Sequence, residues 1–342
     1  MQLSSSQKNL LDILINHEKK VNNKLYSASP YWKYKTKRSL RYLKKYGLTN
    51  FRGIDSGVGT SFADNIVCDT RKELGTKGKL ISWITHLPII NKIFDEQIKM
   101  TSNYINNWIY KNKRYYESND KVKQLVSKYK IENSVEFGCL SKFKLNNREY
   151  STYYLQACDR LENISKLIDL NKIVSYFEIG GGFGANIHLL LNNFKNIKKI
   201  IYLDIVPNLF VGTEYLRHFY GNSVKDYSIL KEQKKIKFSN NNELEIFCIP
   251  PWKIEDIIDN VDHFHNSASF QEMTENIIKN YKNFIFKLLK EKSISLTIYD
   301  GWKRNKTLNP DQINNIFENI YTVQKIPHID NDEKNIFYLI SK

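Results

Sequence analysis

Cysteine is scarce in this chain, and no apolar run is long enough to suggest a membrane span. The four cysteines stand at positions 68, 139, 158 and 248 without a C-x-x-C pair, so the sequence indicates neither a disulfide framework nor a zinc knuckle. The apolar stretch Leu10–Ile15 is short, and the polar residues before it lack the charged start of a signal peptide. We therefore expect a reduced, cytoplasmic protein without a transmembrane segment.

Acidic residues are sparse in one part of the chain only. Residues 1–150 hold 28 Lys and Arg against 13 Asp and Glu, whereas residues 151–342 hold 24 against 23. A chain of 342 residues also exceeds one typical core. The sequence therefore predicts two domains: a basic, mainly helical domain over 1–150 that would cap the substrate, and an α/β domain over 151–342. A genome biased toward Lys, Asn and Ile is the alternative explanation of the charge.

Several stretches of the first domain have helical patterns. An amphipathic helix is predicted to begin near Ser6, with Leu10, Leu11, Leu14 and Val21 on its apolar side, and a longer apolar stripe begins at Pro88. Between them, Pro30–Lys45 interleaves cations with aromatic residues and stops before Gly47. Such a composition suits nucleic acid, an anionic lipid surface or a phosphorylated substrate, unless the aromatics face the core and the cations face water. A further helix, Tyr150–Leu170, leads into the second domain.

The most informative stretch is a glycine-rich turn after a short apolar run. Val174–Ile179 is typical of a buried strand, Asn186–Leu191 of a helix, and Gly180-Gly-Gly-Phe-Gly184 of the turn between them. Glycine lets the backbone turn tightly and approach a ligand, to which the next helix presents its free N–H groups. The stretch predicts a nucleotide-binding cradle, and a turn without a ligand is the alternative.

Two classes of ligand use such a turn. Gly180, Gly182 and Ala185 fit the dinucleotide pattern G-x-G-x-x-G/A. Glu178 with Gly180, Gly182 and Gly184 fits E-x-G-x-G-x-G, the pattern of S-adenosylmethionine (SAM) enzymes. The second pattern is favoured because a carboxylate before the glycines attracts the cationic methionine end of SAM and repels a pyrophosphate.

The ends of two later strands add cofactor candidates. Asp204 closes the run Ile200–Asp204, where its carboxylate can accept hydrogen bonds from ribose hydroxyls. Leu244–Ile249 is followed by Pro250-Pro-Trp252, and Trp252 is predicted to form a wall for the adenine, with a purely structural turn as the alternative. Enzymes that methylate base amines use Asn/Asp-Pro-Pro-aromatic at such a turn, and Ile249 cannot supply the required acceptor.

The fourth predicted strand, Val261–Asn266, and the segment after it should lie nearest the transferred methyl group. The candidates there are His265, Asn266, Ser269, Gln271 and Glu272. Methylation of a hydroxyl requires the loss of its proton, which a histidine or carboxylate within hydrogen-bond reach can accept. His263 and His265 share a strand face, but no third ligand is evident, so we expect no metal.

The end of the sequence distinguishes two types of sheet. A fifth strand, Ile294–Asp300, puts Asp300 on the ligand side, and Tyr321–His328 and Asn335–Ser341 form two extended segments joined by a turn. A seven-stranded SAM-methyltransferase sheet ends with an antiparallel strand inserted in this way, whereas a dinucleotide-binding sheet continues with parallel units. We therefore expect an α/β fold with a Rossmann-like sheet of seven strands and helices on both faces.

Three blocks of the second domain resemble a known family. They are Glu178-Ile-Gly-Gly-Gly-Phe-Gly184, Tyr202–Leu216 with Phe219–Gly221, and Asn266-Ser-Ala-Ser-Phe-Gln-Glu-Met273. Together they look like the sugar O-methyltransferases of bacterial surface-polysaccharide gene sets, over residues 150–342. The resemblance implies that SAM is held by Glu178, Gly180, Gly182, Gly184 and Asp204. It implies that the acceptor side is lined by Asn266, Gln271 and Glu272. An apolar residue is expected in the family at the position of His265, which favours Glu272 as the base.

The sequence thus predicts a transferase that moves a methyl group from SAM to a sugar hydroxyl, in capsule or lipopolysaccharide biosynthesis. The predicted catalytic residues are Glu272, His265 and Asn266, and the predicted substrate contacts are Gln271, Ser269 and Asp300. The acceptor would be a free or carrier-linked sugar, and the basic domain would suit a phosphate on it. The alternatives are a nucleic-acid-binding protein or an RNA/DNA methyltransferase using the basic domain, and an NAD-dependent sugar oxidoreductase.

Overall fold

The computed structural model describes most of the second predicted domain and parts of the first. The described residues are 2–49, 51–52, 117–131, 133–139, 143–145, 147–291, 293–299, 308–318, 321–329 and 331–341. The helix expected from Pro88 and the site residue Asp300 lie outside them. The chain divides into two compact units, one of residues 1–3 and 37–155 and the other of residues 4–36 and 156–342. The first 36 residues therefore belong mostly to the unit that contains the large sheet.

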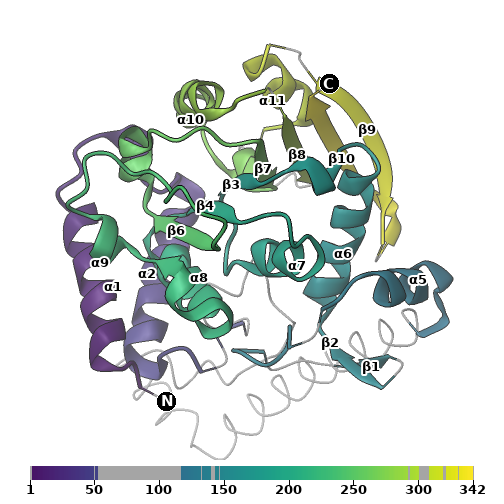
Figure 1. Ribbon diagram of the computed structural model, residues 1–342, viewed down its shortest axis with the longest axis horizontal. Helices are drawn as coiled ribbons and strands as arrows, with labels where there is room; N and C mark the ends of the chain where they lie inside the picture. Colours follow the sequence, from purple (N-terminus) through teal and green to yellow (C-terminus); the bar gives the residue numbers. More distant parts are fainter. Residues whose placement is uncertain are drawn as a thin grey trace, which may run out of the picture. The chain divides into compact units, whose positions relative to one another are not determined.

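An eight-stranded sheet forms the centre of the second unit (Figure 1). Its strands are β3 (Ser175–Ile179), β4 (Lys199–Leu203), β5 (Val224–Lys225), β6 (Glu245–Ile249), β7 (His263–Ser267), β8 (Ile294–Tyr299), β9 (Tyr321–His328) and β10 (Asn331–Ser341). Their spatial order is β5-β6-β4-β3-β7-β8-β10-β9. The pairs from β5 to β8 are parallel, and β10 runs antiparallel to both β8 and β9.

The predicted α/β sheet is confirmed, and so is the predicted antiparallel strand inserted at its end, which is β10. The predicted count of seven strands was wrong by one. The additional strand, β5, has two residues that pair with Ile246 and Phe247 at the edge of the sheet. Two residues between a helix end and a turn carry no periodic pattern, which is why the sequence does not indicate this strand.

Helices cover both faces of the sheet, as expected for mostly parallel strands. In Figure 1, α7 (Ala185–Asn193) and α8 (Val206–Tyr220) lie below the sheet, and α10 (Glu275–Leu288) and α11 (Pro310–Ile316) lie above it. Every residue of β3, β4 and β6 is buried. The continuous apolar runs of these strands therefore follow from burial on both faces. Among the described residues, no helix combines the length and the apolar character needed to cross a membrane.

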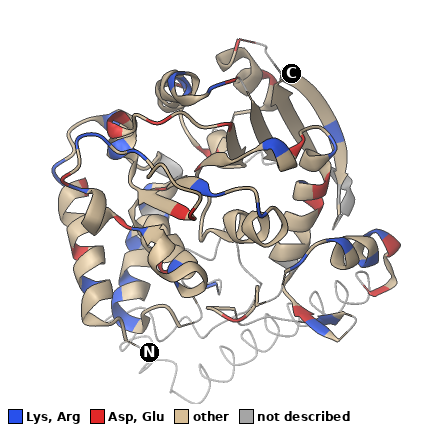
Figure 2. Cartoon of the chain, in the orientation of Figure 1, with Lys and Arg blue, Asp and Glu red and all other residues tan. Residues whose placement is uncertain are grey.

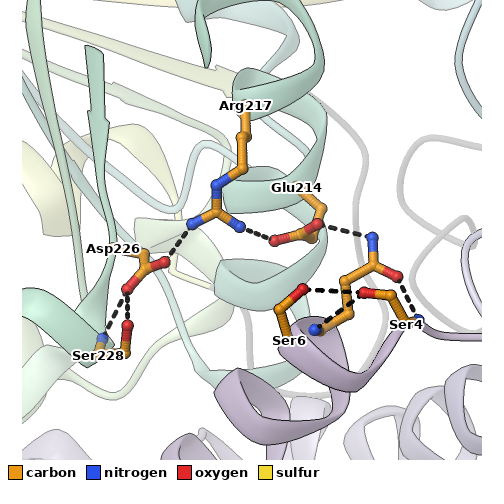
Figure 3. Close-up of polar contacts among 7 residues, drawn as sticks. Ser4, Ser6, Glu214, Arg217, Asp226 and Ser228 are labelled. Atoms are coloured by element: carbon orange, nitrogen blue, oxygen red, sulfur yellow. Dashed lines mark hydrogen bonds and ion pairs between the residues drawn. The ribbon is translucent and has the colours of Figure 1, made fainter. Parts of the chain in front are cut away.

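Helix α1 (Ser5–Glu18) confirms the predicted amphipathic N-terminal helix, but it ends before Val21, which was predicted on its apolar side. Ser4 caps it by accepting from the Gln7 backbone N–H, and the apolar side buries Leu10, Leu11 and Leu14. The Gln7 side chain of α1 also donates a hydrogen bond to Glu214 of α8 at 2.7 Å. Figure 3 shows that Arg217 continues this chain of contacts by joining Glu214 to Asp226.

Helix α2 (Pro30–Tyr46) confirms the predicted basic and aromatic helix. The positions of α2 that are described as exposed are all cationic: Lys33, Lys37, Arg41, Lys44 and Lys45. Trp32 and Leu43 are buried. Figure 2 shows the same concentration of basic residues along this helix. The aromatic and basic residues of α2 are thus at least partly segregated between core and solvent.

The described part of the first unit combines helices with a small hairpin. Helix α5 spans Asp120–Lys128, and β1 (Phe143–Leu145) pairs with β2 (Arg148–Tyr150). Arg52 is fully buried and donates to the Ser134 carbonyl at 2.6 Å and to the Ser151 hydroxyl at 2.7 Å. A mainly helical first domain stays a prediction. The helix expected over Tyr150–Leu170 is shorter, since α6 covers Thr152–Ser165.

Candidate functional site

The glycine-rich turn lies between β3 and α7, as the sequence predicts. Gly180, Gly182 and Gly184 have φ values of 75°, 63° and 87°, a left-handed conformation that favours glycine. A Cβ atom on Gly180 would lie 2.1 Å from the Ser269 hydroxyl oxygen. Both the backbone conformation and the close approach of Ser269 therefore require glycine at position 180.

Glu178 lies at the carboxyl end of β3 and is completely buried. Its Oε1 accepts a hydrogen bond from the Asn186 amide at 2.8 Å, whereas Oε2 is buried without a hydrogen-bond partner among the described residues. Burial raises the pKa of Glu178 to about 7, and the nearby Asp204 adds to this effect. A buried carboxylate oxygen without a partner is costly unless a ligand supplies a cation or a donor.

Asp204 follows the adjacent strand β4 and contacts the glycine-rich turn. Its Oδ2 accepts from the Gly182 backbone N–H at 2.8 Å, and its Oδ1 accepts from the Ile205 N–H at 2.7 Å. Burial raises the pKa of Asp204 to about 7, and these two N–H groups oppose the shift. Because a carboxylate has about four lone-pair sites, hydroxyl donors could still be accommodated. The structure thus brings Glu178, the cradle glycines and Asp204 together.

Asn266 ties the end of β7 to the cradle. Its amide nitrogen donates to the Ile179 carbonyl and to the Ser269 hydroxyl, both at 2.7 Å, and its oxygen accepts from the Phe270 N–H at 3.0 Å. Ser269 in turn contacts Gly180. These contacts give Asn266 and Ser269 a positioning role, and their predicted contacts with reacting groups or substrate stay predictions.

Gln271 is buried and its side chain contacts Tyr299, the last residue of β8. Its side-chain oxygen accepts from the Tyr299 N–H at 2.9 Å, and its amide nitrogen donates to the Tyr299 carbonyl at 3.4 Å. The Gln271 carbonyl also accepts from the Leu308 N–H at 3.1 Å. Gln271 therefore fixes the backbone that leads toward the predicted substrate residue Asp300. Its own contact with a substrate stays a prediction.

Glu272 lies in the short 3-10 helix η8 (Phe270–Glu272) and is buried. Its Oε2 accepts a hydrogen bond from the Trp32 indole nitrogen at 2.6 Å. Burial raises the pKa of Glu272 to about 7, the Trp32 bond and the charge of Lys35 oppose this, and Asp204 reinforces it. The charge of Asp204, which contacts the cradle, therefore also acts on Glu272. A carboxyl group that titrates near neutral pH suits general-base catalysis.

The two histidines of β7 are buried against β8. His263 contacts the hydroxyls of Ser293 and Ser295 at 2.8 and 2.9 Å, and His265 contacts that of Ser295 at 2.8 Å. Burial lowers the pKa of each imidazole to about 3, so both are neutral near pH 7. Among the described residues, no group of three or more His, Cys, Asp and Glu could hold a metal. The catalytic role of His265 stays a prediction.

Trp252 lies in η7 (Pro251–Asp256), directly after β6. Its indole nitrogen donates to the Tyr227 hydroxyl at 3.0 Å, and that hydroxyl also lies 2.8 Å from Nδ1 of His17. The indole ring is held edge-on to Tyr227, with 86° between the planes. Tyr227, itself in contact with His17 of α1, therefore orients the Trp252 indole. The contact of Trp252 with adenine stays a prediction.

Sequence reasoning missed three residues that act on the predicted site, Asn186 and Trp32 through hydrogen bonds and Lys35 through its charge. Asn186 follows Glu178 by eight positions in the first turn of α7, and an amide placed there is a local signal for a partner of a strand-end acid. Trp32 and Lys35 lie more than 230 positions before Glu272. No local pattern could have indicated that α2 reaches Glu272.

Comparisons with known proteins concern the fold only. The chain matches no protein-family model and no curated protein. Among solved structures, the pyocyanin biosynthetic protein PhzM is 10% identical, covers 53% of each chain and has a TM-score of 0.35. The mitomycin 7-O-methyltransferase MmcR is 12% identical, covers 55% of this chain and 54% of its own, and has a TM-score of 0.37. The magnesium protoporphyrin IX methyltransferase from Synechocystis, with bound SAM, is 9% identical, covers 56% of this chain and 80% of its own, and also scores 0.37.

The matched part is about half the length of the first two of these proteins. With such low identities and TM-scores, the similarities assign neither substrate nor chemistry to this chain. The fold assignment rests on the strand order and on the antiparallel β10 of the chain itself.

Proposed function

We propose that this protein is a SAM-dependent methyltransferase. The observation that carries the proposal is Glu178, a fully buried acid whose Oε2 lacks a hydrogen-bond partner among the described residues, beside a turn of left-handed glycines. A cationic ligand would compensate such a carboxylate, whereas a pyrophosphate would be repelled. The antiparallel β10 supports the same proposal against a dinucleotide-binding sheet.

The residues present fit SAM as the cofactor. Glu178 would bind its cationic amino-acid end, Asp204 would accept hydrogen bonds from its ribose hydroxyls, and Trp252 would cover its adenine. When bound, SAM supplies an activated methyl group. Glu272 would accept the proton of the acceptor hydroxyl as the oxygen forms its bond to that methyl group and the carbon–sulfur bond breaks, which leaves S-adenosylhomocysteine.

For the acceptor, we propose a sugar hydroxyl in surface-polysaccharide biosynthesis. The resemblance of the three sequence blocks supports this substrate class. The excess of cations in residues 1–150 supports an acceptor that carries a phosphate, on a nucleotide or a lipid. Asn266, Gln271, Ser269 and Asp300 would shape or contact the acceptor side, and nucleic acid is not the expected partner.

A thermal-shift measurement with matched glycine variants tests the cofactor. At a concentration 100-fold above its Kd, S-adenosylhomocysteine should stabilise the native protein by about 2.7 kcal/mol, whereas NAD should have no effect. Gly180→Ala should abolish this stabilisation because its Cβ would overlap Ser269. Gly221→Ala is the control, since Gly221 also has a positive φ of 51° but no atom within 4 Å of the point where its Cβ would lie.

Stabilisation by NAD instead of S-adenosylhomocysteine would contradict the proposal and favour the oxidoreductase. The acceptor is tested separately with a labelled methyl donor and an extract of nucleotide sugars and surface glycans. Mass analysis should find a sugar that has gained one methyl group. Label transferred only to nucleic acid in a parallel sample would contradict the sugar acceptor while leaving the methyltransferase reaction intact.

A further inference from the structure

Helix α2 acts on the predicted catalytic carboxylate through the hydrogen bond of one side chain, Trp32, and the charge of another, Lys35. Trp32 and Lys35 are three positions apart, a spacing that makes them neighbours on a helix surface. Lys35 Nζ lies 4.9 Å from the centre of the Trp32 ring. Both residues belong to the same compact unit as the sheet and Glu272.

The contact between Trp32 and Glu272 is short and shielded from water. The indole nitrogen lies 2.6 Å from Oε2, and both residues are buried, each with 8% of its surface exposed. An indole N–H can only donate, so it presents a fixed donor to the carboxylate. A hydrogen bond to an ionised acceptor is roughly twice as strong as one between neutral groups. The geometry therefore favours the charged form of Glu272.

The backbone of Glu272 is fixed to the cradle independently of α2. Its N–H donates to the Ser269 carbonyl at 3.1 Å, and Ser269 packs against Gly180. The side chain is then oriented by Trp32. Ser269 thus holds the backbone of Glu272, and Trp32 of α2 holds its carboxylate.

Two described charges act on Glu272, and they have opposite signs. Lys35 on α2 favours the ionised carboxylate, whereas Asp204 at the end of β4 disfavours it. Burial lowers the pKa of Lys35, and Glu272 counteracts that shift. Without Lys35, burial and Asp204 would act against ionisation, and among the described residues the Trp32 indole N–H would oppose them.

We infer that Trp32 and Lys35 are positioning residues for the proposed base: Trp32 orients the Glu272 carboxylate, and the positive charge of Lys35 favours its ionised form. This inference rests on the proposed function, because the carboxylate acts as a base only if a hydroxyl is methylated. It makes α2 a component of the catalytic centre in addition to any contact with the acceptor.

The carboxyl titration of Glu272 tests the inference without a known acceptor. Protein with ¹³C-labelled glutamate side chains is titrated by NMR in the presence of S-adenosylhomocysteine, and Glu272→Gln identifies the signal. Lys35→Met should move the midpoint upward by about one pH unit or more, since a nearby opposite charge has effects of this size. Trp32→Phe should move it in the same direction, and Lys35→Arg should restore it. Lys33→Met, an exposed cation on the same helix, is the control.

Unchanged midpoints in both Lys35→Met and Trp32→Phe would overturn the inference. Activity provides a second readout: with labelled SAM and a mixture of nucleotide sugars, the acidic limb of the pH–rate profile should shift upward in Lys35→Met and return in Lys35→Arg. An equal loss at every pH would indicate a structural role only and would also overturn the inference. Failure of the wild-type protein to bind S-adenosylhomocysteine is a different result, which contradicts the proposed function itself.

Discussion

Glu178 is a single residue that is unfavourable for the free protein and that, in the proposed function, binds the cofactor. Its carboxyl group is surrounded by protein, one oxygen is bonded to Asn186, and the other has no hydrogen-bond partner among the described residues. Stabilising the ionised form in such surroundings requires a compensating charge or donor. The same desolvation strengthens the attraction of that carboxylate for a cationic ligand.

The burial of Glu178 predicts a pH-dependent stability for the free protein. Its pKa in the folded state, about 7, is above the ordinary value of 4.5. The stabilising contribution of the protonated form is therefore fully present below pH 4.5 and is lost as the pH rises through 7. Glu178→Gln should leave the Tm nearly unchanged at pH 5 and raise it at pH 8. The corresponding gain in the free energy of unfolding at pH 8 should be on the order of 3 kcal/mol or less. Thermal unfolding at the two pH values measures this difference.

The exposed acid Glu232, replaced in Glu232→Gln, is the matched control and should show no such difference between the two pH values. Asp204 and Glu272 also have raised pKa values, so Glu178→Gln should reduce the pH dependence without removing it. SAM should bind Glu178 better when the carboxylate is ionised, so its stabilising effect should grow from pH 6 to pH 8. A Glu178→Gln variant that loses stability equally at both pH values would contradict this account.

At the level of elements, continuous local patterns were sufficient for most of the sheet. The run Val174–Ile179 predicted β3 to within one residue, and Tyr321–His328 predicted β9 with its observed bounds. These strands are signalled by apolar residues along their own length. The acids Glu178 and Asp204 could be paired in advance because the carboxyl ends of parallel strands meet at one edge of a sheet.

Contacts between distant elements could not be predicted in this way. Trp32 and Glu272 are 240 positions apart, and nothing in the sequence near either residue indicates the other. The amides of Asn266 and Gln271 were predicted at the site, but their bonds to the backbone depend on how β7, β3 and β8 pack. Tertiary packing thus decides whether a polar residue near a site contacts a ligand or supports a neighbour.

The ion pairs that join α8 to α9 (Tyr227–Leu230) give a prediction at this scale. Arg217 binds both Glu214 and Asp226, whose side chains are only 6% and 11% exposed (Figure 3). Arg217→Met leaves two mostly buried carboxylates without their counter-ion, and unfolding in urea at pH 7 should show a loss of about 2–4 kcal/mol. The expected loss depends on the burial of the two carboxylates, so an exposed ion pair is needed as the control.

Lys279→Met provides this comparison, because Lys279 and its partner Glu275 are both more than half exposed. Its loss should stay below about 1 kcal/mol. If the two variants lost equal stability, the Arg217 contacts would contribute no more than an ordinary surface pair, and they would not be what stabilises the join between α8 and α9.

For the molecule as a whole, the charge is distributed very unevenly along the chain. Nearly all of the net charge of +16 comes from residues 1–150, while residues 151–342 are almost neutral. The proposed cofactor residues lie in the nearly neutral part, where Glu178, Asp204, Gly182 and Gly184 are buried and Gly180 is partly buried. Salt screens exposed charges strongly and buried ones weakly. Binding of the cofactor and binding of an anionic acceptor should therefore respond differently to ionic strength.

Added salt should lower methyl incorporation from labelled SAM into a mixture of nucleotide sugars, while stabilisation by S-adenosylhomocysteine stays nearly constant. Lys37→Gln combined with Lys44→Gln should weaken incorporation at low salt and reduce its salt dependence, since both cations are exposed on α2. The control combines Lys279→Gln with Lys287→Gln, two exposed cations on α10.

If the α2 pair and the α10 pair had the same effect on methyl incorporation, net charge alone would be responsible. If salt weakened S-adenosylhomocysteine binding as much as methyl incorporation, the cations of residues 1–150 would not act through the acceptor, and the proposed phosphate on the sugar would lose its support.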